Sequence, residues 1–413
     1  MKGYLSKIRV REEEELLSFM EKELNANLVR KLLSLKDKHD EKKRLPAFIK
    51  GYFFPLSENL GKEVFDVCKE VQANIGAEQI NIEFYICNSP EINATSIFNQ
   101  AEDVHFVVLN AGLVKKLKLE ELKFAIGHEI GHLIFEHSLF HRVIQFIYPE
   151  YEDLPPLLQQ LYDLWVKLSE ISADRVGLLA TRKLESAISA MFKITCGLNF
   201  PDFKLESFIN LAERTLSEMA KKPIHIFHSH PAISARVKAL HYFFESKTWQ
   251  NFINREEIQE DKELDEKISQ LTLLLKRRPE NSIEHAELDF LASAGFLLAR
   301  CDEKITNEEY DYLINLLSRY FYWPPSYLEK IISDENVLVE ILKRSASFIA
   351  QNFPERTRKL YECLLPILFR DRELHEDEVE LFLNIGVKEL NIPFSEALNF
   401  LLEGIRNYYT PLY

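Results

Sequence analysis

The sequence lacks the features that mark exported and membrane-spanning proteins. It has only five cysteines in 413 residues, scattered and without Cys-x-x-Cys spacing, which favours reduced thiols over a disulfide framework. Its first residues lack the apolar core of a cleaved signal peptide. No stretch approaches the roughly 18 uncharged apolar residues that a transmembrane helix requires. We therefore expect a cytoplasmic protein with no membrane span.

Positive charge is also scarce. The 51 lysines and arginines are outnumbered by 65 aspartates and glutamates, which gives a formal net charge of −14. A protein with this balance is repelled by phosphate backbones and by anionic lipid surfaces, so we expect neither nucleic acid nor an anionic membrane as a partner. The hydrophobic content of 46% is that of a soluble globular protein, and the length allows two or three domains.

One short run carries the strongest chemical signal. The sequence Gly127-His128-Glu129-Ile130-Gly131-His132 places two imidazoles four residues apart, with a carboxylate beside the first. On a helix, His128 and His132 point to the same side, so both can bind one metal ion at about 2.0–2.1 Å, the zinc–nitrogen distance. Glu129 is then left to act on a bound water, as in zinc hydrolases.

The residues around this run predict a helix. Apolar side chains between Leu122 and Ile134 recur at intervals of three and four residues. Gly127 and Gly131 are poor helix formers and cost about 1 kcal/mol each relative to alanine. Their presence indicates that something needs to approach this helix closely.

A zinc hydrolase needs a third protein ligand and an open position for water. The pattern with a third histidine six residues after the second fails, because Ser138 stands there. The other pattern takes a glutamate from a later helix, and Glu170 lies in the periodic stretch 161–184. Asp174, one turn along, can accept the outer N–H of a ligand histidine. The alternative is that both are ordinary solvated carboxylates of a helix.

A histidine cluster follows at residues 225–231, where three of the 12 histidines fall within six residues. Pro231 predicts that the histidines lie on a loop and that a helix starts just after them. That helix would carry Arg236. Taken alone, the cluster is either a second metal site or an exposed loop.

In this order, the motifs resemble the gluzincin family of CAAX prenyl endopeptidases and HtpX-like proteases. The residues that carry the resemblance are His128, Glu129, His132, Glu170, Asp174, His230, Pro231 and Arg236. Upstream, 84–87 and 91–94 are similar to that family's strand and Asn-Ala motif, and His137-Ser138 matches a pair common after the zinc motif. The resemblance covers about residues 45 to 245. The family often has an aromatic residue where this chain has Thr95, so it does not imply a substrate preference.

The resemblance implies a zinc-dependent endopeptidase that acts on protein or peptide substrates. It implies one zinc per chain, held by His128, His132 and Glu170, with Glu129 as the base that takes a proton from water. It also implies that His230 stabilises the oxyanion of the tetrahedral intermediate.

The surrounding residues receive further roles. The resemblance implies that Arg236 pairs with a carboxylate of the site, such as Asp174. For the loop, an alternative stays open, in which His228 or His230 closes over the resting metal as a fourth ligand and keeps the enzyme latent.

A substrate strand is expected beside the site. Asn93, Ala94 and Thr95 begin a predicted edge strand that runs to Phe98, to which an extended peptide can add as a further strand. Asn93 is alternatively a simple turn residue after Pro90.

The predicted fold class is α+β, mainly α with a small β-sheet. We expect an N-terminal helical segment at 1–45, a zincin-type peptidase domain at 46–250, a charged helical linker at 251–284 and an all-helical accessory domain at 285–413.

The last region contains a weak internal repeat, in which 302–309 matches 371–378 as helix, acidic turn and helix. Thr306 and Glu309 fit a capping box, and neither loop has the ligand pattern of a calcium-binding EF-hand. The region resembles the TerB-like domain of tellurite-resistance proteins over about 285–405, which implies an accessory module that either binds a protein partner or senses a stress signal.

Two other functions fit the same residues. One is a peptide-binding or chaperone-like protein that retains zinc but turns over little, and the intact Glu129 counts against it. The other is a scaffold whose helical C-terminal part does the main work.

Overall fold

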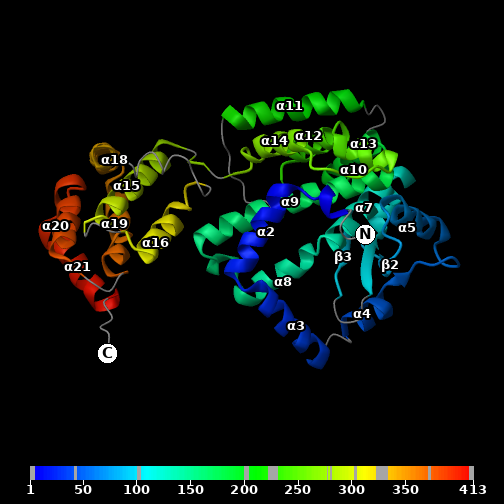
Figure 1. Cartoon of the computed structure of the whole chain (residues 1–413), viewed down its shortest axis with the longest axis horizontal. Helices are drawn as coiled ribbons and strands as arrows, with labels where there is room; N and C mark the ends of the chain where they lie inside the picture. Colours follow the sequence, from blue (N-terminus) through cyan, green and yellow to red (C-terminus); the bar gives the residue numbers. More distant parts are fainter. Residues whose placement is uncertain are drawn as a thin grey trace. The chain divides into compact units, whose positions relative to one another are not determined.

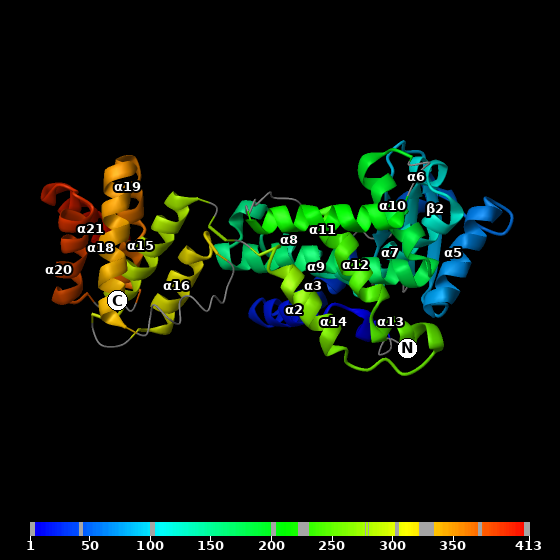
Figure 2. The ribbon, with the colours of Figure 1, turned by 90° about the horizontal axis from the view of Figure 1, so that it is seen from above.

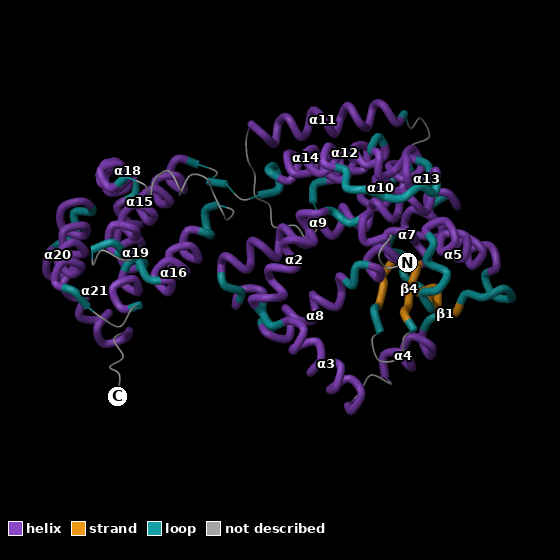
Figure 3. The backbone as a smooth tube through the Cα atoms, in the orientation of Figure 1, coloured by secondary structure: helices purple, strands orange, loops and turns teal. Residues whose placement is uncertain are grey.

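The computed structural model describes residues 5–40, 44–99, 104–199, 204–221, 231–276, 278–279, 281–301, 305–321, 334–370 and 374–408. The chain divides into two compact units. The first holds the described residues up to Leu275 except Leu154–Leu161, and the second holds Leu154–Leu161 and the described residues from Lys276 on. Helices dominate both units, and one small sheet lies in the first (Figure 3). The predicted fold class, mainly α with a small sheet, is confirmed.

The first unit combines a helical framework with strands that fall between residues 54 and 110 (Figure 1). Its helices are α2 (Arg11–Glu23), α3 (Ala26–Asp40), α4 (Arg44–Tyr52), α5 (Lys62–Ile75), α6 (Ala111–Lys116), α7 (Leu119–Ile134), α8 (His137–Ile147), α9 (Pro156–Thr181, in this unit from Tyr162 on), α10 (Leu184–Cys196), α11 (Leu205–Lys221), α12 (Ile233–Phe244), α13 (Lys247–Asn254) and α14 (Lys262–Thr272). Its strands are β1 (Phe54–Pro55), β2 (Ile82–Cys87), β3 (Ala94–Ile97) and β4 (His105–Asn110). The short 3-10 turns are η1 (Ser6–Ile8) and η2 (Tyr151–Asp153).

The sheet is mixed, with the strand order β1-β2-β4-β3 among the described residues. β4 pairs in parallel with β2 and antiparallel with β3, so it is central, and its residues 105–109 are buried. A continuous apolar run of this kind is typical of a strand that is covered on both faces. Among the described strands β3 pairs only with β4, and the edge strand predicted after Asn93 is therefore present.

Helices α7 and α9 approach each other closely through glycines. A Cβ atom added to Gly127 would lie 2.4 Å from the Cβ of Ala180, and one added to Gly131 would lie 3.0 Å from the Cα of Ala173. On the opposite helix, a Cβ at Gly177 would lie 2.8 Å from the ring of Phe124. The close approach predicted from Gly127 and Gly131 is confirmed.

The N-terminal segment is helical, as predicted, but it forms two helices. Asn25 lies between α2 and α3 in the left-handed conformation (φ 48°), which asparagine tolerates better than most residues. α2 buries Glu13, Leu16, Leu17 and Met20, which recur at intervals of three and four residues. A carboxylate on this otherwise apolar face needs a specific partner.

The second unit is helical throughout its described residues. Its elements are α15 (Ser282–Leu298), α16 (Asn307–Leu317), α18 (Glu335–Asn352), α19 (Pro354–Glu362), η3 (Leu365–Phe369), α20 (Glu376–Asn384), η4 (Ile385–Glu389) and α21 (Phe394–Tyr408). α18 lies beside α15 and α19 (Figure 2). The capping box predicted at Thr306 and Glu309 starts α16, and the matching copy of the repeat uses His375 and Glu378 in the same way.

The domain boundaries and the TerB-like resemblance stay predictions. Helices α13 and α14, which fall mostly in the predicted linker, belong to the first compact unit. α14 buries Leu264, Ile268 and Leu271 within it. No helix in the described part of the chain is long and apolar enough to cross a membrane.

We expect the substitution Gly127→Ala to lower the free energy of unfolding by about 1–3 kcal/mol, because the added methyl group overpacks the seam with Ala180. The cost of overpacking exceeds the gain of about 1 kcal/mol that the higher helix propensity of alanine brings. Gly51→Ala is the matched control, since no atom lies within 4 Å of the position that its Cβ would take. Urea unfolding should show equal or higher stability for Gly51→Ala; equal or higher stability for Gly127→Ala would contradict the packing argument.

Candidate metal centre

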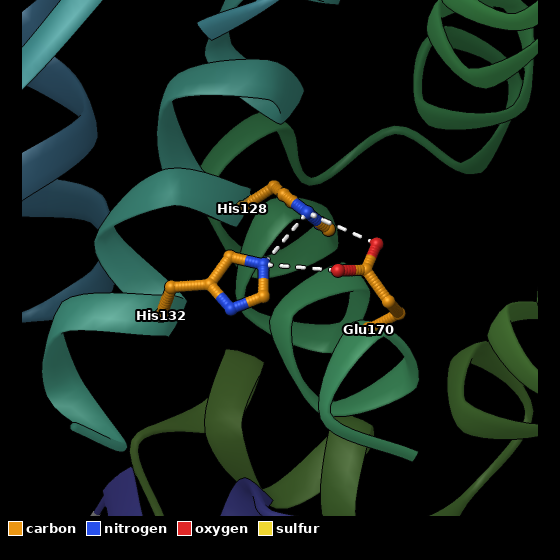
Figure 4. Close-up of side chains that lie close together, drawn as sticks. All are labelled: His128, His132 and Glu170. Atoms are coloured by element: carbon orange, nitrogen blue, oxygen red, sulfur yellow. Dashed lines mark hydrogen bonds and ion pairs between the residues drawn. The ribbon is translucent and has the colours of Figure 1, made fainter. Parts of the chain in front are cut away.

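Three predicted ligands converge between α7 and α9 (Figure 4). His128 and His132 lie one turn apart on α7, and Glu170 comes from α9. The two Nε2 atoms are 3.1 Å apart. Oε1 of Glu170 lies 3.4 Å from Nε2 of His132, and Oε2 lies 3.7 Å from Nε2 of His128.

This spacing suits a tetrahedral metal ion. Ligand atoms bound to zinc at about 2.0–2.1 Å lie about 3.3–3.4 Å from one another in tetrahedral geometry. The measured separations of 3.1, 3.4 and 3.7 Å bracket that value. Two imidazoles with one carboxylate are also a ligand set that zinc hydrolases use. The residues therefore fit zinc in both chemistry and spacing.

Asp174 lies behind His128, away from the ligand cluster. Its Oδ1 is 3.0 Å from Nδ1 of His128, so a neutral His128 donates this outer N–H and keeps a lone pair on Nε2. The guanidinium of Arg236 donates to both carboxylate oxygens, from Nε at 2.8 Å and from Nη2 at 2.6 Å. The expected pairing of Arg236 with a site carboxylate is present. Burial opposes the charge on Asp174, but Arg236 outweighs it and lowers the pKa of that carboxyl.

Arg236 also balances the other acidic groups of the site. Its Nη1 lies 3.4 Å from Oε2 of Glu170. Burial opposes its charge, yet Asp174, then Glu170 and Glu129, raise the pKa of Arg236 above its usual range. Glu129 is half-buried on α7 and does not belong to the ligand cluster, so its carboxylate stays available for proton transfer.

A cavity of about 690 Å³ opens over this cluster. The predicted site residues that line it are Asn93, Ala94, Thr95, His128, Glu129, His132, Glu170 and Arg236. Apolar side chains, among them Phe124, Met191 and Ile194, complete the wall. The structure thus brings the N-terminal end of β3 and the candidate ligands into one cavity, with Asp174 outside its lining.

The edge of β3 is the backbone surface of this cavity. The amide of Asn110 donates to the carbonyl of Asn93 over 3.1 Å. Because backbone groups alternate in direction along an antiparallel ladder, those of Thr95 face β4, whereas those of Ala94 and Ser96 face outward. Among the described strands none pairs with this outer side, so a further strand can add to it.

Part of the predicted loop lies outside the described residues. This holds for His225, His228 and His230, and therefore for the oxyanion role and for the latent alternative. Pro231 is described and lines the cavity, and α12 begins at Ile233, just after it, as predicted.

Three residues near the candidate ligands had no role predicted from the sequence. His137 and His141, both on α8, line the cavity. Nδ1 of His137 lies 2.7 Å from Nδ1 of His132, and Nε2 of His137 lies 3.1 Å from Oε1 of Glu13 on α2. The available signal for Glu13 was its place in the apolar stripe of α2, where a carboxylate is buried among leucines.

Comparison with known proteins finds a similarity in the region that contains α7. Residues 58–150 match the model of Peptidase family M48, a stretch that includes α7 and the sheet strands β2, β3 and β4. The chain is also 26% identical over 158 residues to the plastoglobule-localized metallopeptidase 48 of Arabidopsis thaliana. That alignment covers 34% of this chain and 45% of the relative, less than half of its length. No solved structure matches the chain.

We expect Arg236→Met to lower the free energy of unfolding of chelator-treated protein by about 3–5 kcal/mol, because it leaves the buried Asp174 without its cationic partner. Lys238→Met is the matched control on the same helix. It breaks an ion pair with Glu213, which is 48% exposed, and should cost less than about 1 kcal/mol. Equal losses in the two variants would show that Asp174 does not depend on Arg236.

Proposed function

We propose that this protein is a zinc-dependent endopeptidase that cleaves peptide bonds in protein or peptide substrates. The observation that carries the proposal is the convergence of His128, His132 and Glu170 at tetrahedral spacing, beside a carboxylate that is not part of the cluster. The partial match to Peptidase family M48 supports the same chemistry.

The proposed mechanism assigns one task to each residue. His128, His132 and Glu170 would hold the zinc, which would supply a Lewis acid able to bring the pKa of a water to about 7. Glu129 would take a proton from the attacking water and return it to the leaving amine. Asp174, itself held by Arg236, keeps His128 in the tautomer whose Nε2 faces the ion.

We propose that the substrate binds as an extra strand along β3. Its backbone would pair with the outward groups of Ala94 and Ser96, while Asn93 and Thr95 frame the same side of the cavity. Backbone pairing of this kind accepts many sequences, because the side chains of the bound strand point away from the ladder.

Two further assignments rest on the sequence resemblances. We propose that His230, from the loop before α12, stabilises the oxyanion opposite the metal. We also propose that the second compact unit is an accessory module, which binds a protein partner and carries no catalytic group.

We expect the purified protein to bind one zinc ion per chain and to lose it in His132→Ala and in Glu170→Ala, because two remaining ligands hold the ion too weakly. His285→Ala, which removes an exposed histidine of α15, is the control and should keep full zinc. Elemental analysis after dialysis measures the content. Full zinc in either ligand variant would remove that residue from the site.

We expect Glu129→Gln to retain zinc but to lose nearly all cleavage of an unfolded protein substrate, because the amide cannot take the proton from water. Zinc content and turnover are measured together, because the loss of a base lowers turnover alone, whereas the loss of a ligand also lowers the zinc content. This pair of measurements also separates a peptidase from a zinc-retaining binding protein, in which wild type and Glu129→Gln would be equally inactive. Activity above about a tenth of wild type would exclude Glu129 as the base.

We expect Ser96→Pro to raise KM for an extended peptide by about 10-fold or more, with little change in kcat, because it removes an outward N–H of the edge strand. Proline is tolerated at such a position, so thermal stability should change little. Thr95→Pro is the comparison variant, since its N–H faces β4 and its loss should lower stability instead. An unchanged KM in folded Ser96→Pro would rule out strand addition at β3.

A further inference from the structure

His132 and His137 face each other through their Nδ1 atoms, 2.7 Å apart. Two ring nitrogens at this distance share one proton, so one ring donates and the other accepts. The remaining nitrogen of His137, Nε2, lies 3.1 Å from Oε1 of Glu13. Glu13, His137 and His132 therefore form one chain of hydrogen bonds, and its far end is Nε2 of His132, the atom that faces the ligand cluster.

The ionisation of Glu13 decides the direction of these bonds. Its side chain is fully buried, and Arg9 donates to it through Nε at 2.9 Å and through Nη2. Burial opposes the charge on Glu13, but His137 and Arg9 outweigh it and lower its pKa to about 2. Arg9 and the hydroxyl of Ser172 both donate to this carboxylate, so it is held as a hydrogen-bond acceptor.

An ionised carboxylate can only accept hydrogen bonds. A neutral His137 therefore donates its single proton from Nε2 to Glu13, which leaves Nδ1 of His137 as an acceptor. His132 must in turn donate from its own Nδ1. In that tautomer Nε2 of His132 has no proton, and its lone pair points toward His128 and Glu170.

We propose that Glu13 and His137 are positioning residues of the metal centre, which fix the tautomer and the ring orientation of His132. This inference rests on the proposed zinc site. Asp174 serves His128 in the same way through one direct bond, with Arg236 beside it as Arg9 is beside Glu13. Groups that orient a metal-binding imidazole change metal affinity by about 10- to 100-fold when they are removed.

Helix α2 thereby becomes part of the site, and α9 holds it in place. The hydroxyl of Ser172 donates to Oε2 of Glu13 over 2.5 Å and accepts from the amide of Val10 over 2.9 Å. The buried guanidinium of Arg175 donates to the carbonyl of Ile8 over 3.0 Å. Ser172 and Arg175 lie on the helix that also supplies the third candidate ligand, so one element positions both the carboxylate of the site and the start of α2.

The test compares two histidines of α8. His137→Phe removes the acceptor for His132, whereas His141→Phe makes the same change one turn along, where the ring bonds to Tyr162 instead. Competition with a chromophoric chelator measures the zinc affinity of each folded full-length protein. We expect His137→Phe to bind zinc about 10- to 100-fold more weakly than wild type, and His141→Phe to match wild type. Wild-type affinity in His137→Phe would overturn the inference.

A double-mutant cycle separates positioning from general stability. We expect Glu13→Ala to weaken zinc binding about 10-fold in the wild-type background and to add nothing in His137→Phe, where the chain of hydrogen bonds is already broken. Glu14→Ala, which removes the exposed neighbouring carboxylate, should leave the affinity unchanged. The same loss from Glu13→Ala in both backgrounds would mean that Glu13 acts without His137, contrary to the proposal.

Nitrogen NMR of the histidines in the metal-free wild-type protein shows which ring nitrogen carries the proton. This measurement does not depend on the folding of a variant. We expect His137 to carry its proton on Nε2 and to have a bare Nδ1, and the reverse tautomer would overturn the inference. A wild-type protein that binds no zinc would instead contradict the proposed function, so the two failures are distinguishable.

Discussion

The candidate site depends on how closely the backbones of α7 and α9 can approach. Each of the two histidines follows a glycine on α7, and these glycines face Ala173, Gly177 and Ala180 on α9. With a larger residue at either glycine, the helices would separate by the thickness of a methyl group or more. The carboxylate of Glu170 would then lie too far from the imidazoles to share one ion with them. The two glycines lower the helix propensity of α7, but they allow the close approach of α9 that sets the ligand spacing.

Two buried carboxylates with arginine partners orient the candidate ligand histidines, Asp174 directly and Glu13 through His137. Asp174 and Glu13 are both almost inaccessible to solvent, and a buried charge without a partner is strongly destabilising. Arg236 and Arg9 are the partners of these two carboxylates and keep them ionised, so that each carboxylate only accepts hydrogen bonds. The tautomers of the candidate ligands therefore depend on charges that never touch the metal, and the proposed chemistry depends on the fold of the N-terminal helix.

Most of the site was predictable because its signals are local. The spacing of His128 and His132, the glycines beside them and Glu170 on a later helix follow from helical periodicity and metal chemistry. The role of His137 does not. Five residues after His132, it would point away on a continuous helix, but the chain turns at Glu136 (φ 57°) and brings it back. The partnership with Glu13 spans 124 residues and has no local signal beyond a carboxylate in an apolar stripe.

The central claim is that the side chains on α7 and α9 bind a single zinc ion between them. Anomalous diffraction at the zinc absorption edge, from crystals of the zinc-loaded protein, tests it most directly. We expect one anomalous peak per chain, at about 2.0–2.2 Å from Nε2 of His128, Nε2 of His132 and the carboxylate of Glu170. A peak bound through other side chains, or no peak between these helices, would contradict this claim.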